Sequence, residues 1–248
     1  MPHLVFHMSF ARDIAAEIAS PAIDSDRGAY YLGATGPDMH VLSRSDRQAS
    51  HYFDLECMTE QDSVQSFLNV NADTRRERSG ATAAFVAGYL THLVVDEVWV
   101  VDIYRPCFGP ASPLGGDAKA NLMDRVLQYD MDLQRRVDRT AADEIEQDLR
   151  SSSLQISLDF LDDAILRQWR EVAVDMVSRE PGWERFRFLA GRYLRAAGVG
   201  SDDELDTFFE TVPQLLEQTK RHVGKERIDG FLARSRELSL KTLREYLA

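Results

Sequence analysis

Residues Ala81–Tyr104 form the longest apolar stretch of the chain, and this stretch limits the possible folds more than any other feature. Its length would allow a helix that spans a membrane. However, it includes His92, Asp96, Glu97 and Asp102, and ionisable side chains are costly in the hydrocarbon core of a bilayer. We therefore predict a buried helix inside a soluble protein, without a transmembrane segment.

Apolar residues recur at helical spacing along almost the whole chain, and no segment alternates with a sustained period of two. This pattern predicts an all-α fold, a multi-helix bundle around a central buried helix at about residues 80–104. The other predicted helices are 9–19, 39–46, 59–70, 117–137, 141–149, 154–178, 183–197 and a C-terminal part at 201–247 that is broken near Pro213 and Gly230.

Capping residues and glycines define the boundaries of these elements. Thr59 and Ser79 are candidate N-caps. Ser201, with Glu204 three residues later, makes a capping box. Glycine and proline are dense in residues 24–38, which we predict to be mostly loop.

Charge and cysteine content exclude several classes of protein. The chain has 41 acidic and 29 basic residues and a net charge of -12, so its surface repels the backbone of long nucleic acids. Two cysteines, Cys57 and Cys107, exclude a disulfide scaffold; they suit a reducing compartment or leave one optional bridge. The N-terminal segment is not a standard signal peptide. We therefore expect a cytoplasmic protein.

Histidines are distributed unevenly, since five of the six lie within the first 92 residues. His92 and Asp96 lie four residues apart in the predicted central helix, so both project from one helical face. Imidazole nitrogen and carboxylate oxygen are suitable ligands for zinc. Taken alone, the pair is weak evidence for a metal, and a His–Asp hydrogen bond or ion pair inside a helical core explains it better.

Three other side chains can be explained either by a structural role or by a functional one. Asp38 follows Gly36-Pro37, which restricts the backbone, and it is also a good helix N-cap. His51 lies beside aromatic residues and fits a half-buried loop. His7 is expected one or two residues before the first helix.

These segments together resemble a known family. The pattern consists of Met1, Pro2 and His7, then Tyr31–Asp38 (YLGATGPD), then His51 and Gly88–Trp99 (GYLTHLVVDEVW). It resembles the zinc-dependent phospholipase C family over about the first 108 residues. The resemblance implies an all-α fold, one to three zinc ions and hydrolysis of phosphoesters by metal-activated water. We expect one domain over 1–248, with a metal-binding core at 1–110 and a helical extension at 111–248.

The resemblance also implies ligands. Asp38, His51, His92 and Asp96 would form one zinc site, and His7 would belong to another. Asp38 and Asp96 would in addition be the catalytic carboxylates.

A second metal site is suggested by residues outside that set. Many relatives have a histidine soon after the His-x-x-x-Asp motif, and Asp102 is the nearest candidate here. His222 and Glu226 form the only His-x-x-x-Glu pair in the chain, and the alternative is a solvated basic helix face. Arg105 is a candidate for binding the substrate phosphate, although such an arginine also often pairs with a surface carboxylate.

These observations predict a zinc-dependent phosphoester hydrolase, of phospholipase C type, that acts on a phospholipid or another small phosphoester. The alternative is a non-catalytic helical protein whose metal site is structural or degenerate, because a closed set of four ligands leaves no position for water. A helical site for iron or manganese ranks lower, since the chain has no Glu-x-x-His pair. The sequence does not indicate the oligomeric state.

Overall fold

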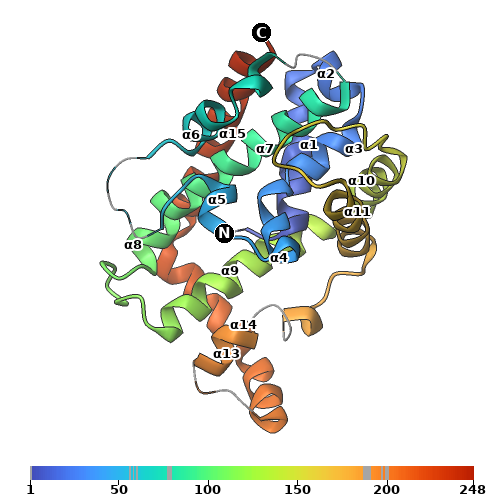
Figure 1. Ribbon diagram of the computed structural model, residues 1–248. Coiled ribbons are helices and arrows are strands. Elements are labelled where there is room, and N and C mark those ends of the chain that lie inside the picture. Colours follow the sequence, from blue (N-terminus) through green and yellow to red (C-terminus); the bar gives the residue numbers. More distant parts are fainter. Residues whose placement is uncertain are drawn as a thin grey trace. The chain divides into compact units, whose positions relative to one another are not determined.

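The computed structural model describes residues 2–55, 57, 59, 61–76, 80–186, 191–196, 198 and 201–248. Over these residues the chain forms helices and loops, with no β-strand (Figure 1). The predicted all-α fold is therefore confirmed.

The chain divides into two compact units, each assembled from three separate segments. The larger unit comprises Leu4–Glu97, Asp138–Arg179 and Ser235–Ala248. The smaller unit comprises Met1–His3, Val98–Val137 and Glu180–Arg234. The predicted single domain with a boundary near residue 110 stays a prediction.

Short helices make up the N-terminal part of the larger unit. They are α1 (Leu4–Ile18), α2 (Pro21–Asp24), α3 (Arg27–Gly33), η1 (Gly36–Met39), α4 (His40–Ser43), α5 (Arg47–His51), α6 (Ser63–Val70) and η2 (Ala72–Arg76). Helix α1 begins at Leu4 and not at the predicted Ser9, because the apolar residues Val5 and Phe6 are already buried there. His7 is consequently a helical residue.

The prediction of a loop over residues 24–38 was wrong. This segment contains α3 and the 3-10 turn η1. Helix α3 is started by Asp26, whose carboxylate accepts a hydrogen bond from the backbone N–H of Ala29 at 2.8 Å. Pro37 falls in the first turn of η1, where its missing N–H costs nothing.

The glycines in this segment serve helix packing. A Cβ atom on Gly33 would lie 1.9 Å from the carbonyl oxygen of Phe85, and one on Gly88 would lie 2.0 Å from that of Tyr30. Helix α3 therefore crosses α7 (Gly80–Trp99) with the two backbones in contact. Only glycine at both positions permits this approach.

Capping also corrects the start of α6. The N-cap is Asp62, whose carboxylate accepts from the N–H of Gln65 at 2.7 Å, and not Thr59. Glu97 of α7 accepts from both the N–H and the hydroxyl of Ser63, at 2.8 and 2.6 Å. These bonds attach the start of α6 to α7. The predicted cap Ser79 lies outside the described residues.

Helix α7 is the predicted central helix. It continues as a π-helical segment η3 (Val100–Tyr104) and a short helix α8 (Arg105–Cys107). The helical stretch therefore ends at Cys107 and not at the predicted Tyr104. The whole stretch Gly80–Cys107 is long and apolar enough to cross a membrane, but 89% of its most apolar window is buried inside the protein. The core helix of a globular domain has the same property.

Two longer helices complete the larger unit, α10 (Arg139–Ser151) and α11 (Asp163–Ser178), together with the end of α15 (Lys225–Leu247). Helix α11 was predicted to begin at Leu154. It begins later because the carboxylate of Asp162 accepts from the N–H groups at the start of the helix. Within α11, the indole N–H of Trp169 donates to the hydroxyl of Thr35 at 2.9 Å.

The smaller unit contains α9 (Ala118–Arg136), η4 (Trp183–Arg185), α13 (Gly191–Ala196), α14 (Asp202–Val223) and the start of α15. Its core includes Leu122, Val126, Tyr129, Phe186 and Leu194. The capping box of Ser201 and Glu204 is present. The predicted helix at 183–197 falls partly on residues outside the described ones.

The C-terminal helices break at a different position from the predicted one. Pro213 lies inside α14 and Gly230 lies inside α15, and neither ends its helix. The break is at Gly224, which follows Val223 and has φ of 84°. Glycine adopts this conformation without the penalty that a Cβ atom imposes.

Candidate metal centre

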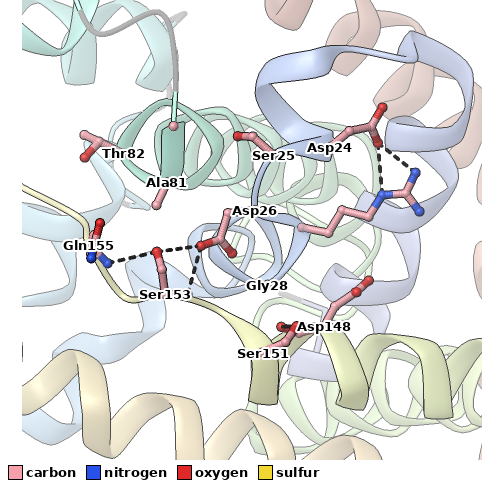
Figure 2. Close-up of a pocket in the computed structure, with 12 residues that line it drawn as sticks. Asp24, Ser25, Asp26, Gly28, Ala81, Thr82, Asp148, Ser151, Ser153 and Gln155 are labelled. Atoms are coloured by element: carbon pink, nitrogen blue, oxygen red, sulfur yellow. Dashed lines mark hydrogen bonds and ion pairs between the residues drawn. The ribbon is translucent and has the colours of Figure 1, made fainter.

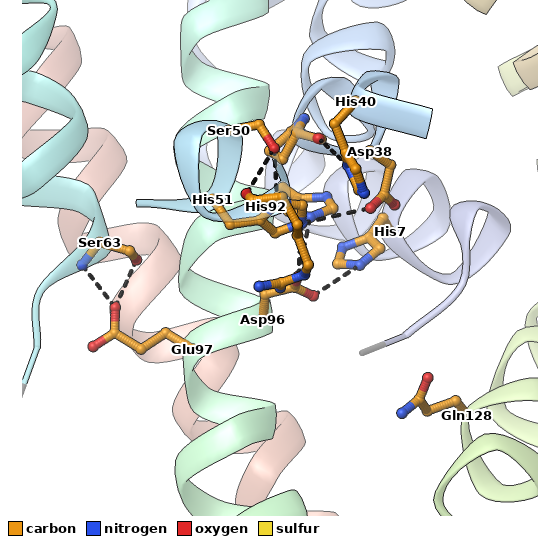
Figure 3. Close-up of polar contacts among 12 residues, drawn as sticks. His7, Asp38, His40, Ser50, His51, Ser63, His92, Asp96, Glu97 and Gln128 are labelled. Atoms are coloured by element: carbon orange, nitrogen blue, oxygen red, sulfur yellow. Dashed lines mark hydrogen bonds and ion pairs between the residues drawn. The ribbon is translucent and has the colours of Figure 1, made fainter. Parts of the chain in front are cut away.

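Five of the predicted side chains converge within the larger unit (Figure 3). His7 comes from α1, Asp38 from η1, His51 from the last turn of α5, and His92 and Asp96 from successive turns of α7. The three histidines and Asp96 have side chains exposed by 5% or less, whereas Asp38 is 27% exposed. The cluster is thus buried, with its accessible side at Asp38.

The two oxygens of Asp96 face different imidazoles. Oδ1 lies 3.3 Å from Nε2 of His7. Oδ2 lies 3.2 Å from Nε2 of His92 and 3.4 Å from Nε2 of His51. Nε2 of His51 also lies 3.5 Å from Oδ1 of Asp38. Asp96 therefore connects two overlapping groups of donors, His7–His92–Asp96 and Asp38–His51–His92.

Local structure explains why α5 carries His51 to this point. Asp46 caps the helix by accepting from the N–H of Gln48. Tyr52 ends it in the left-handed region, at φ of 54°. The hydroxyl of Tyr89 on α7 donates to the carbonyl of Ser50. The helix has only five residues, so these contacts fix its position.

The outer nitrogens of two imidazoles are held by backbone carbonyls. Nδ1 of His92 lies 2.9 Å from the carbonyl oxygen of Ala34, and Nδ1 of His51 lies 3.1 Å from that of Arg47. A carbonyl only accepts, so both Nδ1 atoms carry the proton. In the neutral form of both imidazoles the lone pair is then on Nε2, the arrangement typical of metal-ligating histidines.

Among the described residues, Nε2 of His7, His51 and His92 and Oδ1 of Asp96 are buried without a hydrogen-bond partner. Buried polar atoms are rarely left so. A zinc ion with ligands at about 2.0–2.1 Å has neighbouring tetrahedral donors about 3.3 Å apart. The distances among His92, Asp96 and His51 are 3.2 and 3.4 Å, so the donor set fits zinc.

The comparison with protein families agrees with this chemistry. A family model described as zinc dependent phospholipase C matches residues 6–176, more than half of the chain. The chain belongs to the zinc-dependent phospholipase C family. The match extends well beyond the first 108 residues, which carry the motifs that resemble the family, and it includes α10 and most of α11. No curated protein and no solved structure matches the chain.

Two histidines of this phospholipase C-family cluster have pKa values shifted in opposite directions. Burial and the charge of His92 lower the pKa of His7, despite the nearby Asp96. Burial also acts to lower the pKa of His92, but the charge and close contact of Asp96 outweigh it and raise that pKa. His7 is therefore neutral at pH 7 and its lone pair is available.

The two carboxylates remain ionised. Burial acts to raise the pKa of Asp38, but contact with His51 and the charge of His92 hold it well below its usual range. The pKa of Asp96 is lowered as well, because His92, His51 and His7 together outweigh its burial. Both are therefore anionic at neutral pH.

Sequence analysis missed Arg47 as a residue of this cluster. Its Nη2 lies 3.3 Å from Oδ2 of Asp96, and its side chain is 22% exposed. The signal was its position four residues before His51, which places both on one face of a helix. Because the sequence did not predict a helix at α5, the spacing of Arg47 and His51 could not indicate that they share one face.

The residues predicted for a second metal belong to the smaller unit. His222 and Glu226 are separated by the break at Gly224 and do not share one helix. Nε2 of His222 contacts the carbonyl oxygen of Cys107 at 2.8 Å, and Oδ1 of Asp102 accepts from Arg234 at 2.6 Å. Their role in a second site stays a prediction.

Arg105, the predicted phosphate-binding residue, also lies in the smaller unit, in α8. Its role stays a prediction as well.

A polar cavity of about 550 Å³ is a separate feature of the larger unit (Figure 2). The carboxylate of Asp26 at this cavity accepts from the N–H and the hydroxyl of Ser153, at 3.0 and 2.9 Å, and Arg27 pairs with Asp24. None of the five cluster residues lines it. The cavity and the cluster are therefore separate features of the larger unit.

Proposed function

We propose that the protein is a zinc-dependent phosphoester hydrolase of phospholipase C type. Membership of the family supports the reaction class. The observation that carries the proposal is the set of buried, unpartnered donor atoms on His7, His51, His92 and Asp96. Removing such atoms from water without a partner is costly, and a cation that accepts their lone pairs resolves this cost.

In this proposal Asp38, His51, His92 and Asp96 would hold one zinc ion, and His7 together with Asp96 would hold a neighbouring ion. Zinc supplies the chemistry by lowering the pKa of a bound water towards about 7. Asp38 orients that water or accepts its proton. This role suits Asp38 better than Asp96, because Asp38 is the partly exposed member of the cluster.

The substrate is a small phosphoester, with a phospholipid favoured by the family. A net charge of -12 argues against long nucleic acids. A cytoplasmic location and the number of zinc ions, from one to three, remain part of the proposal.

Replacement of His92 by alanine tests the metal centre. Purified wild-type protein is expected to contain zinc by elemental analysis and to hydrolyse a chromogenic phosphodiester. His92→Ala should lose both. His40→Ala is a matched control, because its Nδ1 contacts the carbonyl of Pro37 and it belongs to neither donor group. Unchanged zinc content in His92→Ala would refute the proposal.

The alternative is a structural site in a non-catalytic protein. Four donors from Asp38, His51, His92 and Asp96 complete a tetrahedral set, which favours this alternative if no other position is open. One zinc ion per chain without turnover would support it. Zinc together with turnover that is lost in Asp38→Asn would exclude it.

A further inference from the structure

The geometry points to Tyr89 as a positioning residue of the metal centre, whose hydroxyl holds α5 so that His51 faces the ligands on α7. The inference rests on the proposed function, but Tyr89 belongs to neither donor group. It starts from one hydrogen bond between two elements. The hydroxyl of Tyr89 on α7 donates to the carbonyl oxygen of Ser50, which directly precedes His51 in α5.

The spacing along α7 places this hydroxyl on the same side as two candidate ligands. Tyr89 lies three residues before His92 and seven before Asp96, so the three side chains share one face of the helix. This face of α7 therefore supplies two candidate ligands and also the anchor for the helix that carries His51. A displacement of α5 relative to α7 would change the distances from His51 to both ligands.

Ser50 connects the anchor to the imidazole of His51. Its hydroxyl donates to the carbonyl of Arg47 at 3.0 Å and lies 3.0 Å from Nδ1 of His51 (Figure 3). Nδ1 of His51 also lies 3.1 Å from the carbonyl oxygen of Arg47. The orientation of the imidazole therefore depends on where the backbone of α5 lies, and Tyr89 bonds that backbone to α7.

Helix α5 depends on such an anchor because it is short. It has five residues, and a helix of this length is not stable by itself. Tyr52 ends it at φ of 54°, a left-handed conformation that is unfavourable for a residue with a Cβ atom. Contacts with other elements of the larger unit must therefore hold α5 in place.

The ring of Tyr89 is itself fixed by packing. The residue is 2% exposed. Its ring stacks on that of Phe67, with the centroids 4.7 Å apart, and also contacts the rings of Phe85 and Phe160. Burial raises the pKa of its hydroxyl well above the usual value, so the hydroxyl keeps its proton at neutral pH. Tyr89 is thus a rigid donor at a fixed point beside α5.

A metal site requires this precision. Nε2 of His51 lies 3.4 Å from Oδ2 of Asp96 and 3.5 Å from Oδ1 of Asp38. Donor atoms have to be held within about 0.5 Å of the productive geometry, by packing and by hydrogen bonds behind the ligands. Loss of such a supporting bond typically weakens metal binding by about 10-fold to 100-fold.

The test compares Tyr89→Phe, which keeps the ring and removes the hydroxyl, with Tyr30→Phe as the matched control. Tyr30 is also buried in the larger unit, and its hydroxyl lies 3.3 Å from that of Thr91 on the same helix α7. A competitive zinc titration measures affinity, and thermal unfolding of the metal-free protein measures stability. Imidazole NMR signals of the metal-free protein report the surroundings of His51.

We expect Tyr89→Phe to bind zinc about 10-fold to 100-fold more weakly than wild type, and Tyr30→Phe to stay within about twofold. In the metal-free protein, Tyr89→Phe should shift the imidazole signals of His51, and Tyr30→Phe should leave them unchanged. A purely structural role of Tyr89 would lower the thermal midpoint without this difference between the two variants.

Two results would overturn the inference. One is a Tyr89→Phe protein that binds zinc with wild-type affinity. The other is an equal loss of zinc affinity in Tyr89→Phe and Tyr30→Phe, which would make Tyr89 a contributor to stability only. Failure of the proposed function is distinguishable from either, because it appears as wild-type protein that takes up no zinc.

Discussion

At the scale of single residues, Asp96 determines more of the centre than any other side chain. One of its oxygens faces His7, and the other faces His92, His51 and Arg47. Its contacts are therefore coupled, and substitutions among these residues will not be additive. The same carboxylate raises the pKa of His92 and acts against the lowering of the pKa of His7.

Asp96→Asn should reverse the pKa shift of His92 in the metal-free protein. Burial lowers this pKa and Asp96 raises it, so removing the carboxylate charge leaves burial dominant and the pKa falls below its usual value of about 6.5. Imidazole chemical shifts followed by NMR against pH measure the change. Asp102→Asn, from the smaller unit, provides the control. A pKa of His92 that stays raised in Asp96→Asn would contradict this explanation.

The carboxylates should also make the metal-free protein sensitive to acid. The pKa values of Asp38 and Asp96 are lower in the folded state than in an unfolded chain. The folded state then binds fewer protons, so the free energy of unfolding falls as the pH decreases. The contribution is complete above about pH 4 and is lost as the pH falls through the folded-state pKa values.

Denaturant unfolding of metal-free wild type and Asp96→Asn, from about pH 3 to pH 6, tests this expectation. The free energy of unfolding of the variant should depend less steeply on pH. Equal slopes in the two proteins would show that Asp96 is not the source of the effect.

At the scale of elements, the crossing of α3 and α7 determines how the centre is held. Contact at Gly33 and Gly88 brings the two helices to backbone distance. The carbonyl of Ala34, which immediately follows α3, then accepts from His92 on α7. A close helix crossing is thus connected directly to the orientation of one candidate ligand.

Gly88→Ala should therefore destabilise the protein and weaken zinc binding together. The new Cβ atom would meet the carbonyl oxygen of Tyr30 at 2.0 Å, and forcing extra atoms into a packed core costs about 1–3 kcal/mol or more. Gly230→Ala is the control, since nothing lies within 4 Å of its Cβ position inside α15. Thermal unfolding and a competitive zinc titration give both quantities. If Gly88→Ala binds zinc with wild-type affinity, the crossing of α3 and α7 does not determine how the centre is held.

The sequence was informative where the spacing alone determines geometry. His92 and Asp96 were placed on one face because four residues make about one helical turn. The loop predicted for residues 24–38 was wrong because Gly33 serves a helix crossing, and the crossing partner lies far away in the chain. Helix α5 was missed because five residues carry almost no periodic signal, and Arg47 was missed with it.

At the scale of the whole molecule, all five candidate ligands belong to the larger unit. A metal ion bound there stabilises the elements that supply the ligands, by an amount set by its concentration relative to its dissociation constant. The helices of the smaller unit supply no candidate ligand, so metal binding does not stabilise them directly.

Removal of zinc by a chelator should lower the thermal midpoint and loosen the larger unit selectively. At a zinc concentration 1,000 times the dissociation constant, the stabilisation is about 4 kcal/mol. Hydrogen–deuterium exchange should show reduced protection in α1, α5 and α7 of the metal-free protein, with little change in α14. Equal loss of protection in α14 would contradict a metal centre confined to the larger unit.

The interleaved segments have a consequence for biosynthesis. Ser235–Ala248 belongs to the same unit as the candidate ligands, where Arg236 pairs with Glu17 and the hydroxyl of Tyr246 donates to the carbonyl of Thr74. A nascent chain emerging from the ribosome therefore exposes all five candidate ligands before the segment Ser235–Ala248 is available to complete their unit. The partly synthesised chain, which still lacks this segment, is the form that most needs protection from aggregation.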